Sequence, residues 1–101
     1  MKDELMSRIL ELETDAVRAQ EFEASYHLLM AALHIAAVAG DREGLDGIAE
    51  RARQRAGAVE AVRPPHRLSR LRAQERGQTA LFDSLMIHVE AAKTRTRTAL
   101  A

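Results

Sequence analysis

Between positions 3 and 19, apolar residues recur at every third or fourth position, which is the spacing of one side of an amphipathic α-helix. The stripe consists of Leu5, Ile9, Leu12, Ala16 and Ala19. Charged residues such as Arg8, Glu11 and Asp15 fall between these positions. The pattern predicts a helix at 3–19 whose apolar stripe faces a core and whose charged side faces solvent.

A more uniformly apolar helix is predicted at 22–39. Its apolar residues spread around most of the helical circumference, so this helix should be the most buried element. Gly40 can adopt the left-handed conformation that ends a helix, and Asp41 is a favourable N-cap for the helix that follows. Because this turn is short, we expect the helices on either side of it to run antiparallel.

The second half of the chain predicts two further helices separated by a proline turn. A third helix is expected at 42–60, and Pro64–Pro65 then breaks the pattern, since proline disfavours a helical conformation in the residue before it. Residues 66–97 have the pattern of one long helix, with a kink or break expected at Gly77 inside a polar segment. Ser69 is a possible N-cap.

Together these elements predict an all-α fold of four helices in a single domain over 1–101. We expect two antiparallel helical hairpins, 3–39 and 42–97, and a disordered tail at 98–101. The predicted core consists of Leu5, Ile9, Leu12, Ala16, Phe22, Ser25, Leu29, Ala32, Leu33, Ala36, Leu45, Ile48, Ala52, Val59, Leu81, Phe82, Leu85 and Val89.

The amino-acid composition excludes several kinds of binding site and limits how much apolar area the helices can bury. The chain has no cysteine, which excludes disulfides, thiolate metal sites and iron–sulfur clusters. Only three residues are aromatic and nineteen are alanine, so helices can approach closely but each contact buries little apolar area. We therefore expect self-association to add burial, with the contact in a homodimer supplied by the long fourth helix through Leu81, Leu85, Met86 and Val89.

Targeting signals are not evident in the sequence. The first residues are acidic and lack the apolar region of a signal peptide, and the longest apolar run, at 28–40, has the length of a buried core helix. The expectation is a cytoplasmic protein that does not enter a membrane. The thirteen arginines and abundant alanine are typical of a bacterial chain encoded by GC-rich DNA.

The charges are divided between the two halves of the chain. Residues 1–50 contain eleven Asp and Glu against four Lys and Arg, and residues 51–101 contain the reverse, so a net charge of zero conceals two opposed halves. Either one half folds on the other, or one copy meets a second, or the basic half meets an external polyanion.

Residues 20–35 resemble the second helix of a tetratricopeptide repeat. The matching positions are an aromatic Phe22, a small Ser25, a bulky Leu29 and the pair Ala32–Leu33, although Gln20 stands where that family has a glycine. The resemblance implies a helical hairpin and a protein-binding role.

Two types of binding residue stand out. His27, Met30 and His34 lie in one file along the second predicted helix and could face a metal ion or haem. However, the two histidines are about 10 Å apart along the axis, too far to share one ion without ligands from another helix. An exposed pair between Glu23 and His27 is the simpler interpretation.

The arginines of the second half could bind the phosphates of a nucleic acid without sequence preference. The candidates are Arg63, Arg67, Arg70, Arg72 and Arg76. No aromatic residues for base stacking lie among them, so ion pairing with the acidic half is the simpler interpretation.

No catalytic motif is present: the serines lie outside any nucleophile elbow, and no glycine-rich phosphate loop exists. The sequence therefore favours a non-catalytic, homodimeric protein-interaction or adaptor module that needs no cofactor. Sequence-independent nucleic-acid binding is the first alternative, and a metal- or haem-binding helical bundle is the second.

Overall fold

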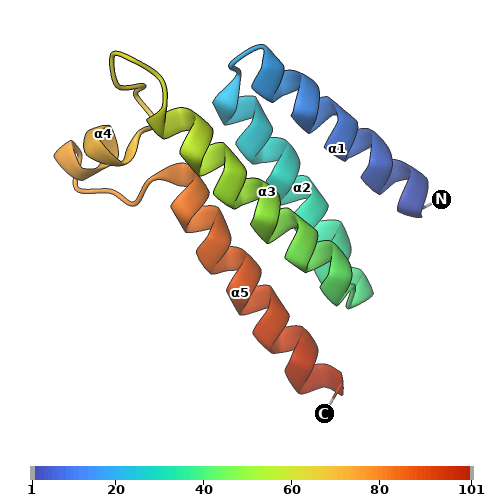
Figure 1. Ribbon diagram of the computed structural model, residues 1–101. Helices are drawn as coiled ribbons and strands as arrows, with labels where there is room; N and C mark the ends of the chain where they lie inside the picture. The colour runs from blue at the N-terminus through green and yellow to red at the C-terminus, as the bar shows by residue number, and fades with distance from the viewer. Residues whose placement is uncertain (1, 101) are drawn as a thin grey trace.

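The computed structural model describes the backbone from residue 2 to residue 100 and the side chains of residues 4–96. All the regular secondary structure in this part of the chain is helical (Figure 1). Its five helices are α1 (Lys2–Arg18), α2 (Phe22–Ala39), α3 (Arg42–Glu60), α4 (Arg70–Glu75) and α5 (Leu81–Leu100). The all-α prediction is confirmed, and the predicted number of four helices is wrong.

The predicted helices at 22–39 and 42–60 coincide with α2 and α3. The long helix predicted at 66–97 is instead divided into α4 and α5, with Gly77 in the break at a φ of +68°. A tail at 98–101 was expected to lack structure, whereas α5 continues to Leu100, and Ala101 lies outside the described residues.

Three helices end with the same backbone motif. A left-handed residue follows each of them: Gln20 (φ 58°) after α1, Gly40 (φ 65°) after α2 and Gly77 (φ 68°) after α4. The next N–H then donates to a carbonyl five residues back, in the last turn of the helix. These bonds are Glu21 N–Ala16 O (2.8 Å), Asp41 N–Ala36 O (2.9 Å) and Gln78 N–Ala73 O (2.8 Å).

Side-chain caps begin two of the helices, as the sequence predicts. The Asp41 carboxylate accepts the backbone N–H of Gly44 at 2.9 Å at the start of α3. The Ser69 hydroxyl accepts the N–H of Arg72 at 3.2 Å at the start of α4. Each cap satisfies an N–H that the first helical turn leaves without a partner.

The helices form a flat assembly of 45 × 27 × 16 Å. α2 packs against α1 on one side and against α3 and α5 on the other, and α3 also packs against α5. α1 therefore lies at one edge of the molecule, away from α5 (Figure 1). The largest fully buried apolar side chains are Leu29, Leu45, Ile48, Val59, Leu85 and Val89.

The predicted core stripe of α1 is wrong for Leu5 and Leu12, whereas Ile9 packs against the core as predicted. Leu5 and Leu12 are 51% and 56% exposed, and Ile9 and Ala16 are only partly buried. The buried side of α1 is rotated by about a third of a turn from that stripe, and it carries Glu13, which has no exposed surface. Other residues of α1 that pack against the core are Met6, Ile9, Leu10 and Val17. α1 thus has two apolar sides, and only one of them packs against the rest of the protein.

Among the described residues, only α2 is long and apolar enough to cross a membrane by length and composition. Here it packs against α1, α3 and α5, and it buries one continuous side. The buried residues of α2 are Phe22, Ser25, Leu29, Ala32, Leu33 and Ala36. The length and apolar composition of α2 therefore also fit a core helix that packs against three neighbouring helices.

Candidate functional site

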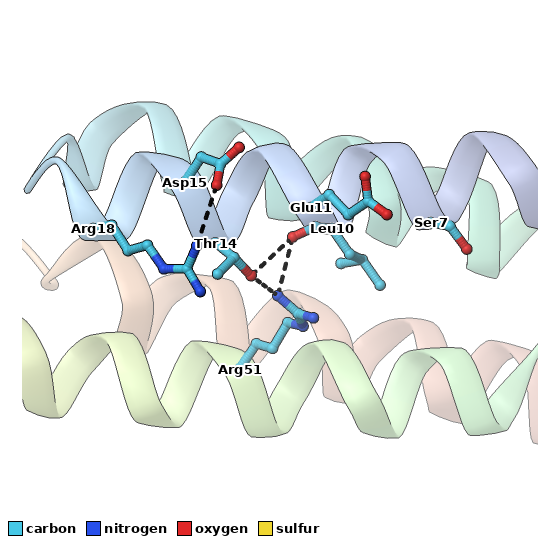
Figure 2. A pocket seen from close by; sticks show the side chains of 7 residues that line it. All are labelled: Ser7, Leu10, Glu11, Thr14, Asp15, Arg18 and Arg51. Carbon is cyan, nitrogen blue, oxygen red and sulfur yellow. Dashed lines mark hydrogen bonds and ion pairs between the residues drawn. The ribbon is translucent and has the colours of Figure 1, made fainter.

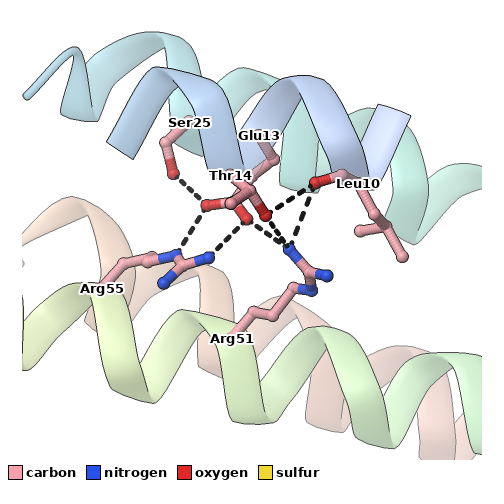
Figure 3. A network of polar contacts seen from close by, with 6 residues as sticks. All are labelled: Leu10, Glu13, Thr14, Ser25, Arg51 and Arg55. Atoms are coloured by element: carbon pink, nitrogen blue, oxygen red, sulfur yellow. Dashed lines mark hydrogen bonds and ion pairs between the residues drawn. The ribbon is translucent and has the colours of Figure 1, made fainter. Parts of the chain in front are cut away.

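A buried carboxylate joins three helices at the edge of the molecule (Figure 3). Glu13 of α1 accepts a hydrogen bond from the Ser25 hydroxyl of α2 at 2.6 Å. From α3, Arg55 donates through Nε to Oε2 at 2.7 Å and through Nη2 to Oε1 at 2.9 Å, and Arg51 donates to Oε1 at 2.7 Å. Four donors thus satisfy one carboxylate, and we refer to Glu13, Ser25, Arg51 and Arg55 as the Glu13 cluster.

Arg51 also binds the backbone of α1. Its Nη1 donates to the Leu10 carbonyl at 3.2 Å and to the Thr14 hydroxyl at 3.1 Å. The Thr14 hydroxyl in turn donates to the same Leu10 carbonyl at 3.1 Å. α1 is therefore connected to α3 through both the Glu13 side chain and one turn of its backbone.

The cluster keeps Glu13 ionised. Burial by itself raises the pKa of this carboxyl, but hydrogen bonds from Arg55, Ser25 and Arg51, with the positive charge of Arg55, outweigh burial and hold the pKa below its ordinary value of 4.5. The side chains of Arg51 and Arg55 remain 30% and 15% exposed, so part of their charge is still hydrated. The site is a fixed charged contact within the fold.

The opposed charges of the two halves meet within one chain. Besides the Glu13 cluster, Arg67 pairs with Glu23 at 3.3 Å and Lys93 pairs with Asp46 at 2.6 Å. In each of these contacts the acid belongs to residues 1–50 and the base to residues 51–101. The two oppositely charged halves therefore form ion pairs with each other within one chain.

A pocket of about 500 Å³ lies beside the Glu13 cluster, between α1 and α3 (Figure 2). Its lining offers carboxylate, guanidinium and hydroxyl groups, and Arg18 and Asp15, one turn apart on α1, form an ion pair at 3.7 Å. The lining residues are Ser7, Leu10, Glu11, Thr14, Asp15, Arg18 and Arg51. The lining combines charges of both signs and gives no strong preference for an anion or a cation.

The five arginines proposed from the sequence as a polyanion site all have partners within the chain. Arg67 pairs with Glu23, Arg70 with Asp83 and Arg72 with Glu75. Arg63 and Arg76 donate to backbone carbonyls, at Glu60 and Arg67 respectively.

The pair formed by Arg70 and Asp83 has two bonds, at 2.8 and 2.9 Å, and it links α4 to α5. The hydrogen bond from Arg70, together with its charge, lowers the pKa of Asp83, and burial opposes this effect only in part. This arginine therefore helps to hold the short α4 in place.

The histidines of α2 do not converge on a site. His27 and His34 are exposed, whereas Met30 is partly buried against the core. Glu23 pairs with Arg67 instead of the predicted His27. Within the described residues, no group of three His, Cys, Asp or Glu side chains is placed to hold a metal ion.

The dimer contact predicted on the last helix requires a correction. Leu85 and Val89 have no exposed surface, and Leu81 and Met86 pack against the same core. The division of the predicted long helix explains this result, because the shorter α5 lies along α3 and α2 instead of projecting from the molecule. Leu85 and Val89 are therefore core residues.

The outer side of α1 carries the two leucines, Leu5 and Leu12, that were predicted to lie in the core. Leu5 and Leu12 are exposed, with the partly buried Ile9 between them and Ala16 one turn further on. We call Leu5, Ile9, Leu12 and Ala16 the outer stripe. Other large exposed apolar residues, such as Val38 and Leu71, occur singly on different helices, which is common on protein surfaces.

Comparison of the chain with protein-family models, with curated proteins and with solved structures found no match.

Proposed function

We propose that this chain is a non-catalytic helical protein-interaction module that forms a homodimer. The outer stripe carries this proposal. An edge helix whose exposed Leu5 and Leu12 continue a regular apolar spacing through the partly buried Ile9 and Ala16 is the feature that a partner helix would cover. The Glu13 cluster supports the same function, because it fixes α1 at three points and so presents the stripe on a rigid helix.

The charged residues favour this function over binding of a nucleic acid. An arginine that already donates to a carboxylate or a carbonyl must give up that contact before it can neutralise a phosphate. Arg70 is the clearest case, because it makes two bonds to the partly buried Asp83, whereas the exposed pairs of Arg67 and Arg72 are exchanged more easily. Retention on heparin that falls steeply with salt would support the alternative.

We further propose that the helices form two antiparallel hairpins of the tetratricopeptide type, α1 with α2 and α3 with α5, with α4 as an insertion. The packing of α1 on α2 and of α3 on α5 supports this arrangement, as does the burial of Phe22, Ser25 and Leu29. A hairpin pair of this kind leaves the outer side of its first helix without a neighbour, as in α1.

The molecular mass in solution tests the proposed homodimer. Sedimentation equilibrium should give a mass that rises with protein concentration from 11.2 kDa toward twice that value. The same behaviour is expected in about 0.5 M salt, where the Debye length of about 4 Å removes most attraction between exposed charges. A mass of 11.2 kDa at every concentration would overturn the proposal.

A further inference from the structure

Resting on the proposed function, we propose that the homodimer forms by antiparallel packing of α1 against α1 of a second copy through the outer stripe. The spacing of the stripe is the first reason. Leu5, Ile9, Leu12 and Ala16 are separated by four, three and four positions, which is the repeat of the apolar seam in a two-stranded coiled coil. A stripe with this repeat faces one partner helix along its whole length.

The antiparallel arrangement allows every residue of the stripe to be covered. Leu5 packs against the partner's Ala16, and Ile9 packs against the partner's Leu12. The two-fold axis repeats both contacts, so four layers form from one short helix pair. Each layer includes at least one large side chain, and the exposed surfaces of Leu5 and Leu12 are removed from water.

Charges beside the stripe select this orientation. Arg8 and Asp15 flank the stripe on the same side of α1, and their side chains are 72% and 69% exposed. In the antiparallel register Arg8 lies opposite the partner's Asp15, and the two-fold axis creates the pair twice. Their present contacts, with Glu4 and Arg18, are exposed pairs within α1 and can be exchanged at little cost.

A parallel arrangement is less suitable because of the Glu13 cluster. In a parallel pair, Arg8 would lie near the partner's Glu13. Glu13 is fully buried, and it already accepts four hydrogen bonds from within its own chain. Its carboxylate is therefore turned away from the surface, and Arg8 and Asp15 would both lack an opposite charge.

The position of α1 leaves room for a second copy. α1 lies at the edge of the molecule (Figure 1), and the outer stripe occupies a different side of it from the pocket that faces α3. A contact made by two short helices buries less than about 1,200 Å², which is the range of weak and reversible complexes. Self-association should accordingly be measured up to high protein concentration.

Two charge reversals test the orientation. Arg8→Glu places two like-charged pairs in the dimer, with Glu at position 8 facing the partner's Asp15, and Asp15→Arg does the same with opposite sign. Each variant alone should dimerise about ten-fold more weakly than the wild type. An equal mixture of the two variants should regain wild-type affinity, because each unlike pair is restored in the mixed dimer. Gln54→Glu, on the exposed side of α3, is the control and should not change the affinity.

The outcomes separate this inference from the proposed function. Recovery of dimerisation in the mixture, with native helicity in both variants by circular dichroism, supports the antiparallel pair. A wild-type dimer whose affinity is unchanged by either substitution, or a mixture no stronger than the separate variants, overturns the antiparallel α1 contact but leaves the homodimer. A wild type that remains monomeric overturns both.

Discussion

Arg55 on α3 holds Glu13 on α1 with two hydrogen bonds, Nε to Oε2 at 2.7 Å and Nη2 to Oε1 at 2.9 Å. Two parallel bonds fix both the distance and the orientation of the groups. Arg51 and Ser25 supply the remaining bonds to this carboxylate. The helix that carries the outer stripe is thereby held by the most enclosed charged group of the described residues.

Replacement of Glu13 should be far more damaging than replacement of a nearby exposed acid. Glu13→Gln removes the charge that compensates Arg51 and Arg55, and it should lower the free energy of unfolding by about 3 kcal/mol. This value is at the low end for a buried ion pair because both arginines are partly hydrated. The exposed Glu11→Gln is the matched control and should cost less than about 0.5 kcal/mol. Urea unfolding followed by circular dichroism measures both. Equal effects would show that the cluster does not hold α1.

Acid should weaken the fold, and the Glu13 cluster should supply much of this effect. The folded pKa of Glu13 lies below its ordinary value of 4.5, so its contribution to stability is complete above that pH and is lost as the pH falls through the folded pKa. Arg70 likewise holds the pKa of Asp83 below its ordinary value of 3.8, so the contribution of Asp83 to stability is also lost as the pH falls through its folded pKa. The unfolding free energy of Glu13→Gln, measured from about pH 6 to pH 3, should therefore fall less steeply than that of the wild type. Parallel curves would contradict this explanation.

Two leucines of α1 that are two positions apart should respond differently to truncation. Leu10 packs against the core, whereas Leu12 is 56% exposed. At a protein concentration low enough to dissociate the proposed dimer, Leu10→Ala should lower the free energy of unfolding by about 2 kcal/mol and Leu12→Ala by less than about 0.5 kcal/mol. Thermal and urea unfolding of the two variants give the comparison. A larger loss for Leu12→Ala would mean that the stripe faces the core after all.

Two glycine substitutions should have opposite signs. Gly57 lies within α3 with open space where a Cβ would be, so Gly57→Ala should stabilise the fold by about 0.5–1 kcal/mol. Gly77 also has open space but has a φ of +68°, so Gly77→Ala should destabilise it by about 1 kcal/mol. Urea unfolding measures both effects. Stabilisation by Gly77→Ala would indicate that the break between α4 and α5 does not need a left-handed residue.

Local sequence signals were sufficient for the centre of the fold. α2 is apolar over its whole length, and the adjoining Gly40 and Asp41 end one helix and begin the next through bonds within a few residues. The bounds of α2 and α3 could therefore be predicted without knowledge of the tertiary structure. Ser69 and Gly77 likewise marked one cap and one break.

The position of α4 between α3 and α5 depends on contacts between residues that are distant in the sequence. Glu60 accepts the backbone N–H of Arg70 at 2.8 Å, and the Arg70 side chain binds Asp83. Both contacts are made by Arg70, the first residue of α4, and they hold it against the end of α3 and the first turn of α5. Periodicity alone does not reveal them. The prediction of one long helix at 66–97 is wrong, and two of the dimer-contact residues predicted on it, Leu85 and Val89, lie in the core.

The orientation of α1 could not be predicted from its own residues. Both of its apolar sides have helical spacing, and the side with Leu5 and Leu12 has the more regular pattern. The buried side also carries Glu13, and its donors Arg51 and Arg55 lie 38 and 42 positions away along the chain, where the pattern of α1 cannot reveal them. The placement of these two arginines one turn apart on α3 was the only available signal.

The most direct test of the interaction surface is sedimentation equilibrium of the wild type and of Leu12→Asp, at matched concentrations and with the helicity of both checked. We predict that the wild-type mass rises above 11.2 kDa with concentration, while the variant, with a charge at the centre of the outer stripe, remains at that mass. A wild type that stays at 11.2 kDa, or a variant that associates equally well, would contradict the assignment of α1 as the interaction surface.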